Sequence, residues 1–272
     1  MTKLMQSSAS QPPHIIIVGG TSGIGLALAL QHQKLGWQVT IVGSNENKIT
    51  KLNLEHPDIR TYRCDLTDLI QRQRLMTELS KVRFERLIYS AGSYTNERVH
   101  TLNQVDSEQI LAINLQAFQD IFSWASQQLK SQALEGDNQL AYVDKLSLIC
   151  IASIAGTLDY PYTSLYAKSK RAMIATSSAY RTALTPFQIQ VTCIASGYID
   201  TQALRDLNNG DASHKPFIIS IDKAVSHIMQ AIDNNVELGV FPRPMRYIVR
   251  ALNHLPKPLL NRLLRAKVDK DN

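Results

Sequence analysis

Short apolar segments of strand length alternate with segments of helical period along almost the whole chain, and this alternation restricts the possible folds more than any other feature. The segments HIIIVG and LSLICIA are apolar throughout, which is typical of parallel strands covered by helices on both faces. We therefore predict a doubly wound parallel α/β sheet of about seven strands with helices on both faces, followed by short C-terminal helices. The expected strands are residues 14–19, 38–43, 59–64, 86–90, 145–152, 188–195 and 237–241, and the expected helices include 23–36, 67–82, 105–133, 163–184 and 222–234.

The length and composition favour one large domain. With 272 residues, of which 44% are hydrophobic and 19% charged, the chain can build a sizeable core and differs from disordered, collagen-like and coiled-coil sequences. We expect this domain to span residues 14–242, with a flexible terminus at 1–13 and an extension at 243–272. Residues 197–216 form the longest irregular segment of the domain and are a candidate lid over a substrate site.

The sequence shows neither a membrane span nor a secretory signal. It has no run of about 18 consecutive apolar residues, and its first ten residues lack the apolar stretch of a signal peptide. Cys64, Cys150 and Cys193 are few and far apart, so we interpret them as reduced packing residues. The seven histidines have no metal-ligand spacing, and no metal is expected. These features predict a soluble, cytoplasmic protein.

The net charge of +6 is concentrated at one end of the chain. Residues 241–272 contain eight basic and two acidic side chains, so the rest of the chain is neutral overall. A nucleic-acid role for the body therefore has little support. Apolar residues at helical spacing on both sides of Pro256 and Pro258 predict two short amphipathic helices. These helices either pack on the body or across a subunit interface, which we favour, or rest on anionic lipid.

A glycine-rich turn follows the first expected strand and leads directly into a helical segment. Its spacing is G-x-x-x-G-x-G over Gly19, Gly23 and Gly25. Glycines in such a turn let the backbone approach a pyrophosphate, and the N–H groups at the start of the helix can bind it. A glycine cluster alone is weak evidence, but here the strand, turn and helix favour a dinucleotide site.

Tyr166 and Lys170 are four residues apart in an expected helix, so both side chains can point into one pocket. An ammonium close to a phenol favours the phenolate and would lower the pKa of Tyr166 from about 10 towards neutrality, as a general acid or base requires. Ser153 lies thirteen residues before Tyr166, at the end of an expected strand, where open α/β sheets build their sites. The three residues together argue against a chance Y-x-x-x-K pair.

These motifs resemble the short-chain dehydrogenase/reductase family, whose fold is of the Rossmann type. The resemblance covers about residues 14–242 and includes CDLTD, Ser90-Ala91-Gly92, INL and the segment from Ser196 to Thr201. The chain departs from the family pattern at Val18, Ser90 and Ser196, outside the catalytic set. The resemblance implies Asn114, Ser153, Tyr166 and Lys170 as catalytic residues. The expected cofactor-binding residues are Gly19, Thr21, Ser22, Gly23, Ile24, Gly25, Ser44, Asn45, Asp65, Leu66, Ala91, Gly92, Tyr166, Lys170, Gly197, Ile199 and Thr201.

Several of these positions have a second possible role. Asp65 contacts the adenine ring, as the resemblance implies, or caps the helix that begins near Thr67. Thr201 binds cofactor or caps the next helix. Positions that line the substrate pocket in the family are occupied by residues that more often only pack, namely Tyr160, Tyr162, Leu204 and Phe217. Trp37 and Trp124 are assigned to the core or to an interface.

The residues after the second expected strand bear on the choice between NAD and NADP. In the family an acidic residue there binds the ribose hydroxyls of NAD, whereas an arginine one place later often pairs with the 2′-phosphate of NADP. This chain has Gly43, Ser44 and Asn45, without a carboxylate or an arginine. We therefore predict NADP(H) in preference to NAD(H), with Ser44, Asn45 and Thr21 as hydrogen-bond donors.

The resemblance implies an oxidoreductase that transfers hydride between NADP(H) and a small carbonyl or alcohol, as a homodimer or homotetramer. Ser153 and Tyr166 would bind the substrate oxygen, and Tyr166 would move the proton. Lys170 would hold the nicotinamide ribose, supported through water by Asn114. The alternative is a catalytically silent nucleotide-binding protein that senses the cofactor ratio. Retention of the catalytic residues favours the enzyme, and the substrate itself stays open.

Overall fold

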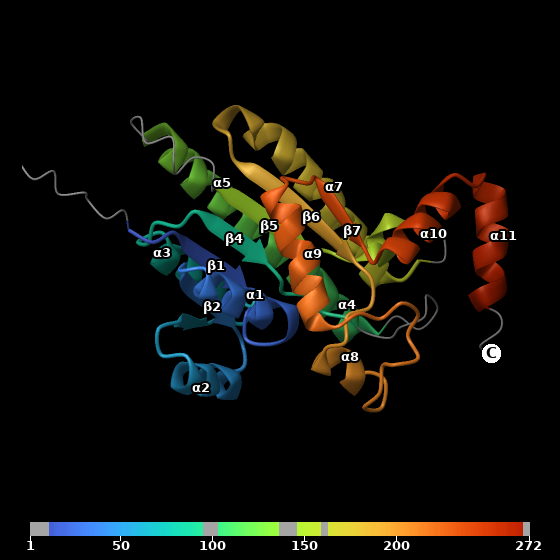
Figure 1. The fold of residues 1–272 in the computed structure, drawn as a ribbon, viewed down its shortest axis with the longest axis horizontal. Coiled ribbons are helices and arrows are strands. Elements are labelled where there is room, and N and C mark those ends of the chain that lie inside the picture. The colour runs from blue at the N-terminus through green and yellow to red at the C-terminus, as the bar shows by residue number, and fades with distance from the viewer. Residues whose placement is uncertain (1–10, 95–102, 136–145, 159–162, 269–272) are drawn as a thin grey trace, which may run out of the picture.

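The computed structural model describes residues 11–94, 103–135, 146–158 and 163–268. Within these ranges seven strands form one parallel sheet in the order β3-β2-β1-β4-β5-β6-β7, and the prediction of a doubly wound α/β fold is confirmed (Figure 1). The strands are β1 (His14–Val18), β2 (Gln38–Gly43), β3 (Arg60–Arg63), β4 (Arg86–Tyr89), β5 (Ser147–Ile151), β6 (Gln190–Ser196) and β7 (Leu238–Phe241).

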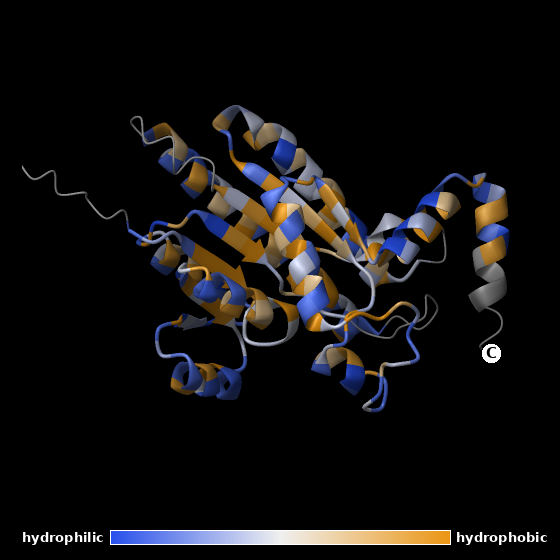
Figure 2. Ribbon diagram, viewed as in Figure 1, coloured by the Kyte–Doolittle hydropathy of each residue, from blue (hydrophilic) through white to orange (hydrophobic). Residues whose placement is uncertain are grey.

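Helices cover the sheet on both faces, and each face has its own hydrophobic core. Ile15 and Ile17 of β1 belong to one core, and Ile16 and Val18 belong to the other, because successive side chains of a strand point in opposite directions. The central strands are therefore buried on both faces and mostly apolar (Figure 2). The first face is covered by α1 (Gly23–Lys34), α2 (Glu46–Glu55) and α9 (Ile221–Asp233), and the second by α3 (Leu69–Leu79), α5 (Phe118–Glu135) and α7 (Leu165–Leu184).

Helix α2 is absent from the sequence prediction, and its burial pattern explains why. Leu52 is its only buried residue, and most of its side chains face solvent. The stronger signal is its N-cap, because the side chain of Asn45 accepts a hydrogen bond from the backbone N–H of Lys48 at 2.9 Å. The expected helix 105–133 is interrupted as well: α4 (Gln104–Leu111) continues into a π-helical turn, η1 (Ala112–Ala117), before α5 begins.

The segment 197–216 is less irregular than predicted. It contains the short helix α8 (Gln202–Asp206), and Ile199 forms an isolated parallel bridge with Ile219 just beyond the segment. Two short 3₁₀ helices, η2 (Ile154–Thr157) and η3 (Thr185–Phe187), lie before and after α7.

The three cysteines are buried and free, as expected of packing residues. Trp37 and Trp124 pack against the two cores from their edges, as the core assignment predicts.

The last two described helices are α10 (Arg243–Asn253) and α11 (Lys257–Val268), and they confirm the predicted pair of C-terminal helices. α10 begins where β7 ends, at the carboxyl edge of the sheet, and α11 stands beside it at the outer end of the molecule (Figure 1). Among the described residues, no helix combines the length and the apolar character that crossing a bilayer requires. Residues 1–10, most of the predicted flexible terminus, lie outside the described ranges.

Candidate active site

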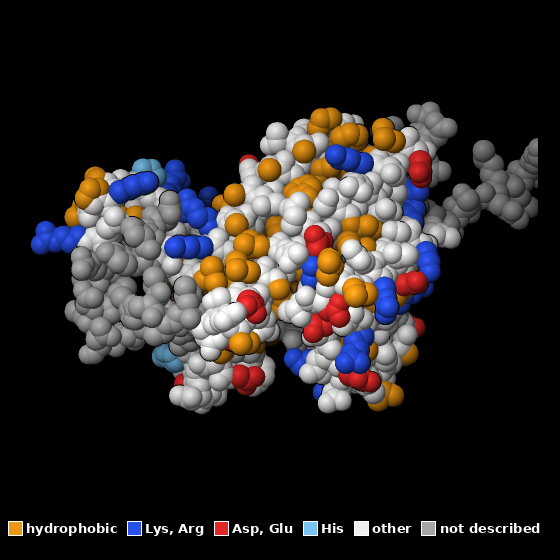
Figure 3. Space-filling view, turned by 180° about the vertical axis from the view of Figure 1, so that it is seen from behind, with side chains coloured by type: hydrophobic (Ala, Val, Ile, Leu, Met, Phe, Trp, Pro, Cys, Tyr) orange, Lys and Arg blue, Asp and Glu red, His pale blue; other side chains and the backbone are white. Residues whose placement is uncertain are grey.

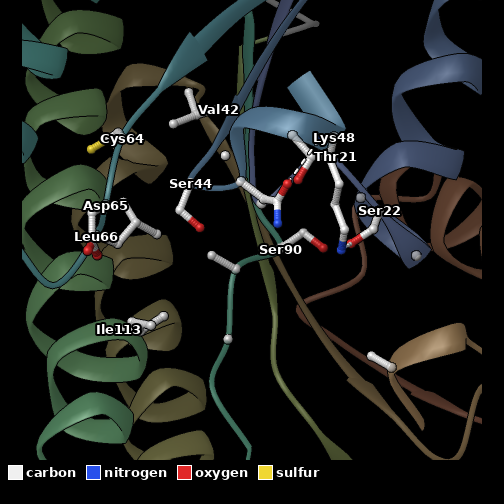
Figure 4. Close-up of a pocket in the computed structure, with 18 of the residues that line it drawn as sticks. Thr21, Ser22, Val42, Ser44, Lys48, Cys64, Asp65, Leu66, Ser90 and Ile113 are labelled. Atoms are coloured by element: carbon white, nitrogen blue, oxygen red, sulfur yellow. Dashed lines mark hydrogen bonds between the residues drawn. The ribbon is translucent and has the colours of Figure 1, made fainter. Parts of the chain in front are cut away.

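The carboxyl ends of the strands border a cavity of about 950 Å³, near the upper end of the range for cofactor and ligand pockets. Its walls come from the turn after β1, the ends of β2, β3 and β4, the turn η1 and the start of α8 (Figure 4). The predicted cofactor-binding residues that line it are Gly19, Thr21, Ser22, Gly23, Ile24, Gly25, Ser44, Asn45, Asp65, Leu66, Ala91, Gly92 and Thr201.

The turn after β1 needs its glycines for both conformation and space. Gly19 has φ of +81°, and a Cβ there would lie 2.5 Å from the backbone nitrogen of Ala91. A Cβ on Gly25 would collide with the carbonyl oxygen of Gly19. The helix α1 follows at once, and its N-cap Ser22 makes no side-chain hydrogen bond to the first turn. The backbone of this turn can therefore come close to an anionic group at the start of α1.

Lys48 is a cationic residue of the cavity that the sequence analysis missed. It lies in the first turn of α2, and its Nζ donates a hydrogen bond to Ser22 Oγ at 3.4 Å across the end of β2 (Figure 4). Ser44 and Asn45, which were predicted to bind a phosphate, line the same wall. Asn45 Oδ1 is occupied in capping α2. The N-cap at Asn45 was the signal that could have revealed Lys48, because it fixes where α2 begins.

The structure shows which of the two expected roles, cavity lining or helix capping, Asp65 and Thr201 have. Asp65 lines the cavity and accepts hydrogen bonds from the N–H and hydroxyl of Thr67 at 2.9 and 2.8 Å. The alternative role of Asp65 as a helix cap is wrong, because α3 is capped by Asp68. Thr201 lines the cavity and also caps α8, since its Oγ1 accepts a hydrogen bond from the N–H of Leu204 at 3.2 Å.

Ser153, Tyr166 and Lys170 come together beside this cavity. Ser153 follows β5 as the N-cap of η2, and its hydroxyl forms a hydrogen bond with that of Tyr166. Tyr166 and Lys170 are one turn apart in α7, and Lys170 Nζ lies 5.8 Å from the centre of the Tyr166 ring. Nζ also donates a hydrogen bond to the carbonyl oxygen of Ile151 at 3.3 Å. Tyr166 and Lys170 therefore lie on one face of α7, as their spacing predicts, with Ser153 beside Tyr166.

The predicted effect of Lys170 on the phenol is wrong. Burial raises the pKa of Tyr166 to about 12, and the hydrogen bond with Ser153 offsets only part of that rise. Lys170 is only 4% exposed, and burial lowers its own pKa as well. Its ammonium is also directed at the carbonyl of Ile151. Tyr166 is thus a protonated phenol at neutral pH, which suits a proton donor.

Asn114 braces the loop after β4 against α7. Its Oδ1 accepts a hydrogen bond from the N–H of Ser93 at 2.9 Å. Its Nδ2 donates to the carbonyl of Ser93 at 2.9 Å and to Ser169 Oγ at 3.0 Å. Gly92 lies between the two halves of the site, because it lines the cavity and a Cβ on it would be 3.0 Å from Lys170 Nζ and 3.5 Å from Asn114 Oδ1. The cofactor-sized cavity and the residues around Tyr166 therefore adjoin at Gly92.

Four predicted cofactor residues lie outside the cavity wall: Tyr166 and Lys170, described above, and Gly197 and Ile199. Gly197 faces α10, where a Cβ on it would lie 2.5 Å from Met245 Sδ. Ile199 is buried and belongs to the same hydrophobic core as Ile15 and Ile17. The loop after β6 is thus packed against the body here, and only its later residue Thr201 reaches the cavity.

Aromatic residues other than the predicted ones surround Tyr166. The Tyr94 ring stands edge-on to that of Tyr166 with centroids 4.7 Å apart, and Tyr94 and Tyr198 both contribute to the raised pKa of Tyr166. Tyr160 and Tyr162 lie outside the described residues, and Phe217 is 48% exposed. Leu204 is half-buried in α8. Within the described ranges no group of His, Cys, Asp and Glu could hold a metal ion.

The model of the short chain dehydrogenase family matches residues 13–212. The chain belongs to this family. A curated relative, the 3-oxoacyl-(acyl-carrier-protein) reductase FabG of Rickettsia bellii, is 28% identical over 195 residues, which are 71% of this chain and 76% of that protein. The dehydrogenase/reductase SDR family member 7B of Xenopus tropicalis is 22% identical over 275 residues, which cover 96% of this chain and 80% of the relative.

Solved structures of short-chain dehydrogenases share the fold. One from Sphingobium yanoikuyae in complex with NADPH superimposes with a TM-score of 0.76 at 18% identity, covering 89% of this chain and 92% of that one. One from Burkholderia cenocepacia in complex with NADP gives a TM-score of 0.75 at 18% identity, covering 93% and 98%. The prediction of a Rossmann-type short-chain dehydrogenase is thus confirmed.

Proposed function

We propose that this short-chain dehydrogenase transfers hydride between NADP(H) and a carbonyl or alcohol substrate. The observation that carries the proposal is the junction at Gly92. There, a cavity of dinucleotide size adjoins the group formed by Ser153, Tyr166 and Lys170. This arrangement at the carboxyl edge of a parallel sheet supplies a cofactor site and a proton donor side by side.

The residues of the cavity fit a dinucleotide that carries an additional phosphate. The turn from Gly19 to Gly25 would hold the pyrophosphate, since side chains at its glycines would fill the cradle. Asp65 and Leu66 would border the adenine. Lys48, Ser22 and Ser44 would hold the 2′-phosphate at the end of β2, where the cation favours an anionic ligand. The cofactors in the Sphingobium and Burkholderia structures support the same choice.

The side chains around Tyr166 account for the chemistry that the protein must provide. When bound, NADPH supplies the hydride that reduces the carbonyl carbon. Ser153 and Tyr166 donate hydrogen bonds to the substrate oxygen, and Tyr166 gives up its proton as the alkoxide forms. The Lys170 ammonium lies 5.8 Å from the centre of the Tyr166 ring and would hold the cofactor ribose. Asn114 keeps the Ser93 backbone in place beside Lys170.

Two measurements test the proposal. Titration with NADPH and NADH, followed by nicotinamide fluorescence, should show tighter binding of NADPH by about tenfold. Tyr166→Phe should abolish turnover in a screen of carbonyl substrates and leave NADPH affinity within about twofold of wild type. Tyr180→Phe is the matched control, because Tyr180 lies on the same helix and its hydroxyl bonds only to Gln119 among the described contacts. Near-normal turnover by Tyr166→Phe would refute the mechanism.

The regulatory alternative makes a different prediction in the same experiments. A nucleotide-binding sensor would bind NADPH and turn over none of the carbonyl substrates, with or without Tyr166.

We retain as predictions a lid function for residues 197–216, a homodimer or homotetramer, and a cytoplasmic location. Sedimentation velocity of the full chain measures the oligomeric state directly.

A further inference from the structure

Helices α10 and α11, called the basic arm below, expose apolar side chains at the outer end of the molecule. Tyr247 and Ile248 of α10 are 66% and 47% exposed, and Leu259 and Leu263 of α11 are each 50% exposed. Both helices are amphipathic, so these residues are not scattered singly but follow the helix faces. An exposed apolar surface of this kind marks an interaction site.

The charge of the arm has a single sign. Between Arg243 and Val268 the sequence contains seven basic residues and no acidic one. All five basic residues of the arm whose side chains are described are exposed, namely Arg243, Arg246, Arg250, Lys257 and Arg262. Lysine and arginine side chains lie beside hydrophobic ones at this end of the molecule (Figure 3). The arm is therefore complementary to a surface that is both negatively charged and apolar beneath.

Only one edge of α10 is occupied by the body of the protein. Met245, Val249 and Leu252 are half-buried, and Met245 Sδ contacts the position of Gly197. Asn253 Nδ2 donates a hydrogen bond to the carbonyl oxygen of Thr157 at 3.0 Å, which ties the end of α10 to η2. These contacts fix the orientation of α10, and its edge with Tyr247 and Ile248 remains open to solvent.

We propose that the basic arm docks on the surface of an anionic lipid bilayer. Amphipathic helices bind such surfaces by inserting their aliphatic residues at the headgroup boundary while lysines and arginines contact anionic headgroups. A second copy of the arm is a poor occupant, because a two-fold contact would bring seven basic residues against seven others. An acidic soluble protein would match the charge but would leave Leu259 and Leu263 without a hydrocarbon environment.

Docking would also orient the active site. Thr157, to which α10 is tied, lies in the 3₁₀ helix that Ser153 begins. The end of the molecule that carries Ser153 would therefore face the bilayer. The docking itself rests only on the arm and is independent of the proposed reaction.

Flotation of the full-length protein with vesicles tests the proposal. Vesicles of phosphatidylcholine with phosphatidylglycerol should bind the protein at low salt, pure phosphatidylcholine vesicles should not, and raised salt should weaken binding. Each basic residue near an anionic surface is worth about fivefold in partitioning, so Arg246→Gln with Arg250→Gln should lower it on the order of twentyfold. Leu259→Ser with Leu263→Ser should lower it by at least about tenfold.

Matched variants on the body control for changes in total charge and apolarity. The double variant Lys34→Gln with Arg60→Gln removes two exposed charges from the body. The variant Leu54→Ser removes a leucine that is 80% exposed. Each of these two controls should leave vesicle binding unchanged. Thermal unfolding of each variant checks that it is folded. Equal binding to both vesicle types, or arm variants that bind like wild type, would overturn the proposal. The proposal would also be overturned if the protein bound no vesicles and the arm variants changed its sedimentation coefficient. The arm would then contact a second copy of the chain.

Discussion

Gly156 lies directly against the backbone of Lys170. A Cβ on Gly156 would be 2.7 Å from the carbonyl carbon of Lys170 and 2.6 Å from the backbone nitrogen of Arg171. This contact holds η2, which begins at Ser153, on α7, which carries Tyr166 and Lys170. The distance between the serine and tyrosine hydroxyls is therefore set by backbone packing and not by the two side chains alone.

Gly156→Ala should separate these hydroxyls. The methyl group would push η2 away from α7, and overpacking of this kind costs about 1–3 kcal/mol of unfolding free energy. We expect kcat to fall by about tenfold or more, because catalytic geometry tolerates little displacement. Gly36→Ala is the control: its φ of +80° makes a side chain costly, but no atom lies within 4 Å of its Cβ. It should lower stability and leave kcat unchanged, whereas unchanged kcat in Gly156→Ala would show that the spacing is adjustable.

The pKa of Tyr166 near 12 predicts a different pH dependence for each of the two reaction directions. Carbonyl reduction needs the protonated phenol, which is present throughout pH 6 to 9, so its rate should stay nearly flat. Alcohol oxidation needs the phenolate, and its fraction rises about tenfold per pH unit below the pKa. Initial rates of oxidation from pH 7 to 10 should follow that slope. A plateau in oxidation below pH 8 would mean that the complex with substrate and cofactor has a far lower pKa at Tyr166.

The candidate site residues could be located from the sequence because their placement depends on local rules. Tyr166 and Lys170 share a helix face by spacing alone, and Ser153 follows a strand that is mostly apolar. The core strands were predictable for the same reason, since HIIIVG has no polar face to confuse the assignment. The least predictable elements lie at the surface, as α2 does, which buries only Leu52.

Properties that depend on how segments far apart in the sequence pack together, such as a pKa shift caused by burial, could not be predicted from the sequence. The pKa of Tyr166 was predicted to fall because Lys170 is near in sequence, yet burial dominates and raises it. Tyr94 contacts Tyr166 through a loop that no local pattern connects to α7. Asp65 and Asp68 are equally good caps in sequence, and only the backbone places Asp68 at the start of α3.

Lys48 should select NADPH over NADH. Its ammonium lies at the end of β2 beside Ser22, and removing one charged contact to a phosphate should weaken NADPH binding by about tenfold. Lys48→Gln should therefore raise the Kd for NADPH and leave the Kd for NADH unchanged in fluorescence titrations. Lys51→Gln, on the next turn of α2, is the control, because Lys51 pairs with Glu55 at 3.7 Å and is absent from the cavity wall. Equal losses for both cofactors would assign Lys48 to a different part of the dinucleotide.

His32 should make the fold sensitive to mild acid. Its Nδ1–H donates to the carbonyl of Leu28 at 2.7 Å, so Nε2 is the acceptor for Arg86 at 3.0 Å. Burial lowers the pKa of His32 to about 4, below its ordinary value of 6.5. Between these two values the unfolded chain binds a proton that the folded chain excludes, so stability falls as the pH falls through this window. The contribution of His32 to the unfolding free energy should decrease by about 2 kcal/mol from pH 7 to pH 4.5.

A pair of histidine variants isolates this effect in urea unfolding at several pH values. His32→Gln keeps an acceptor for Arg86 and removes the titrating ring, so its stability should depend less on pH than that of wild type by about 2 kcal/mol over that range. His254→Gln is the matched control, because His254 makes the same bond to a carbonyl four residues earlier, Arg250 O at 2.7 Å, but at an exposed position. Its acid sensitivity should equal that of wild type. If His32→Gln also behaves like wild type, the acid-labile element lies elsewhere, and His14 is the next residue to test, since burial lowers its pKa too.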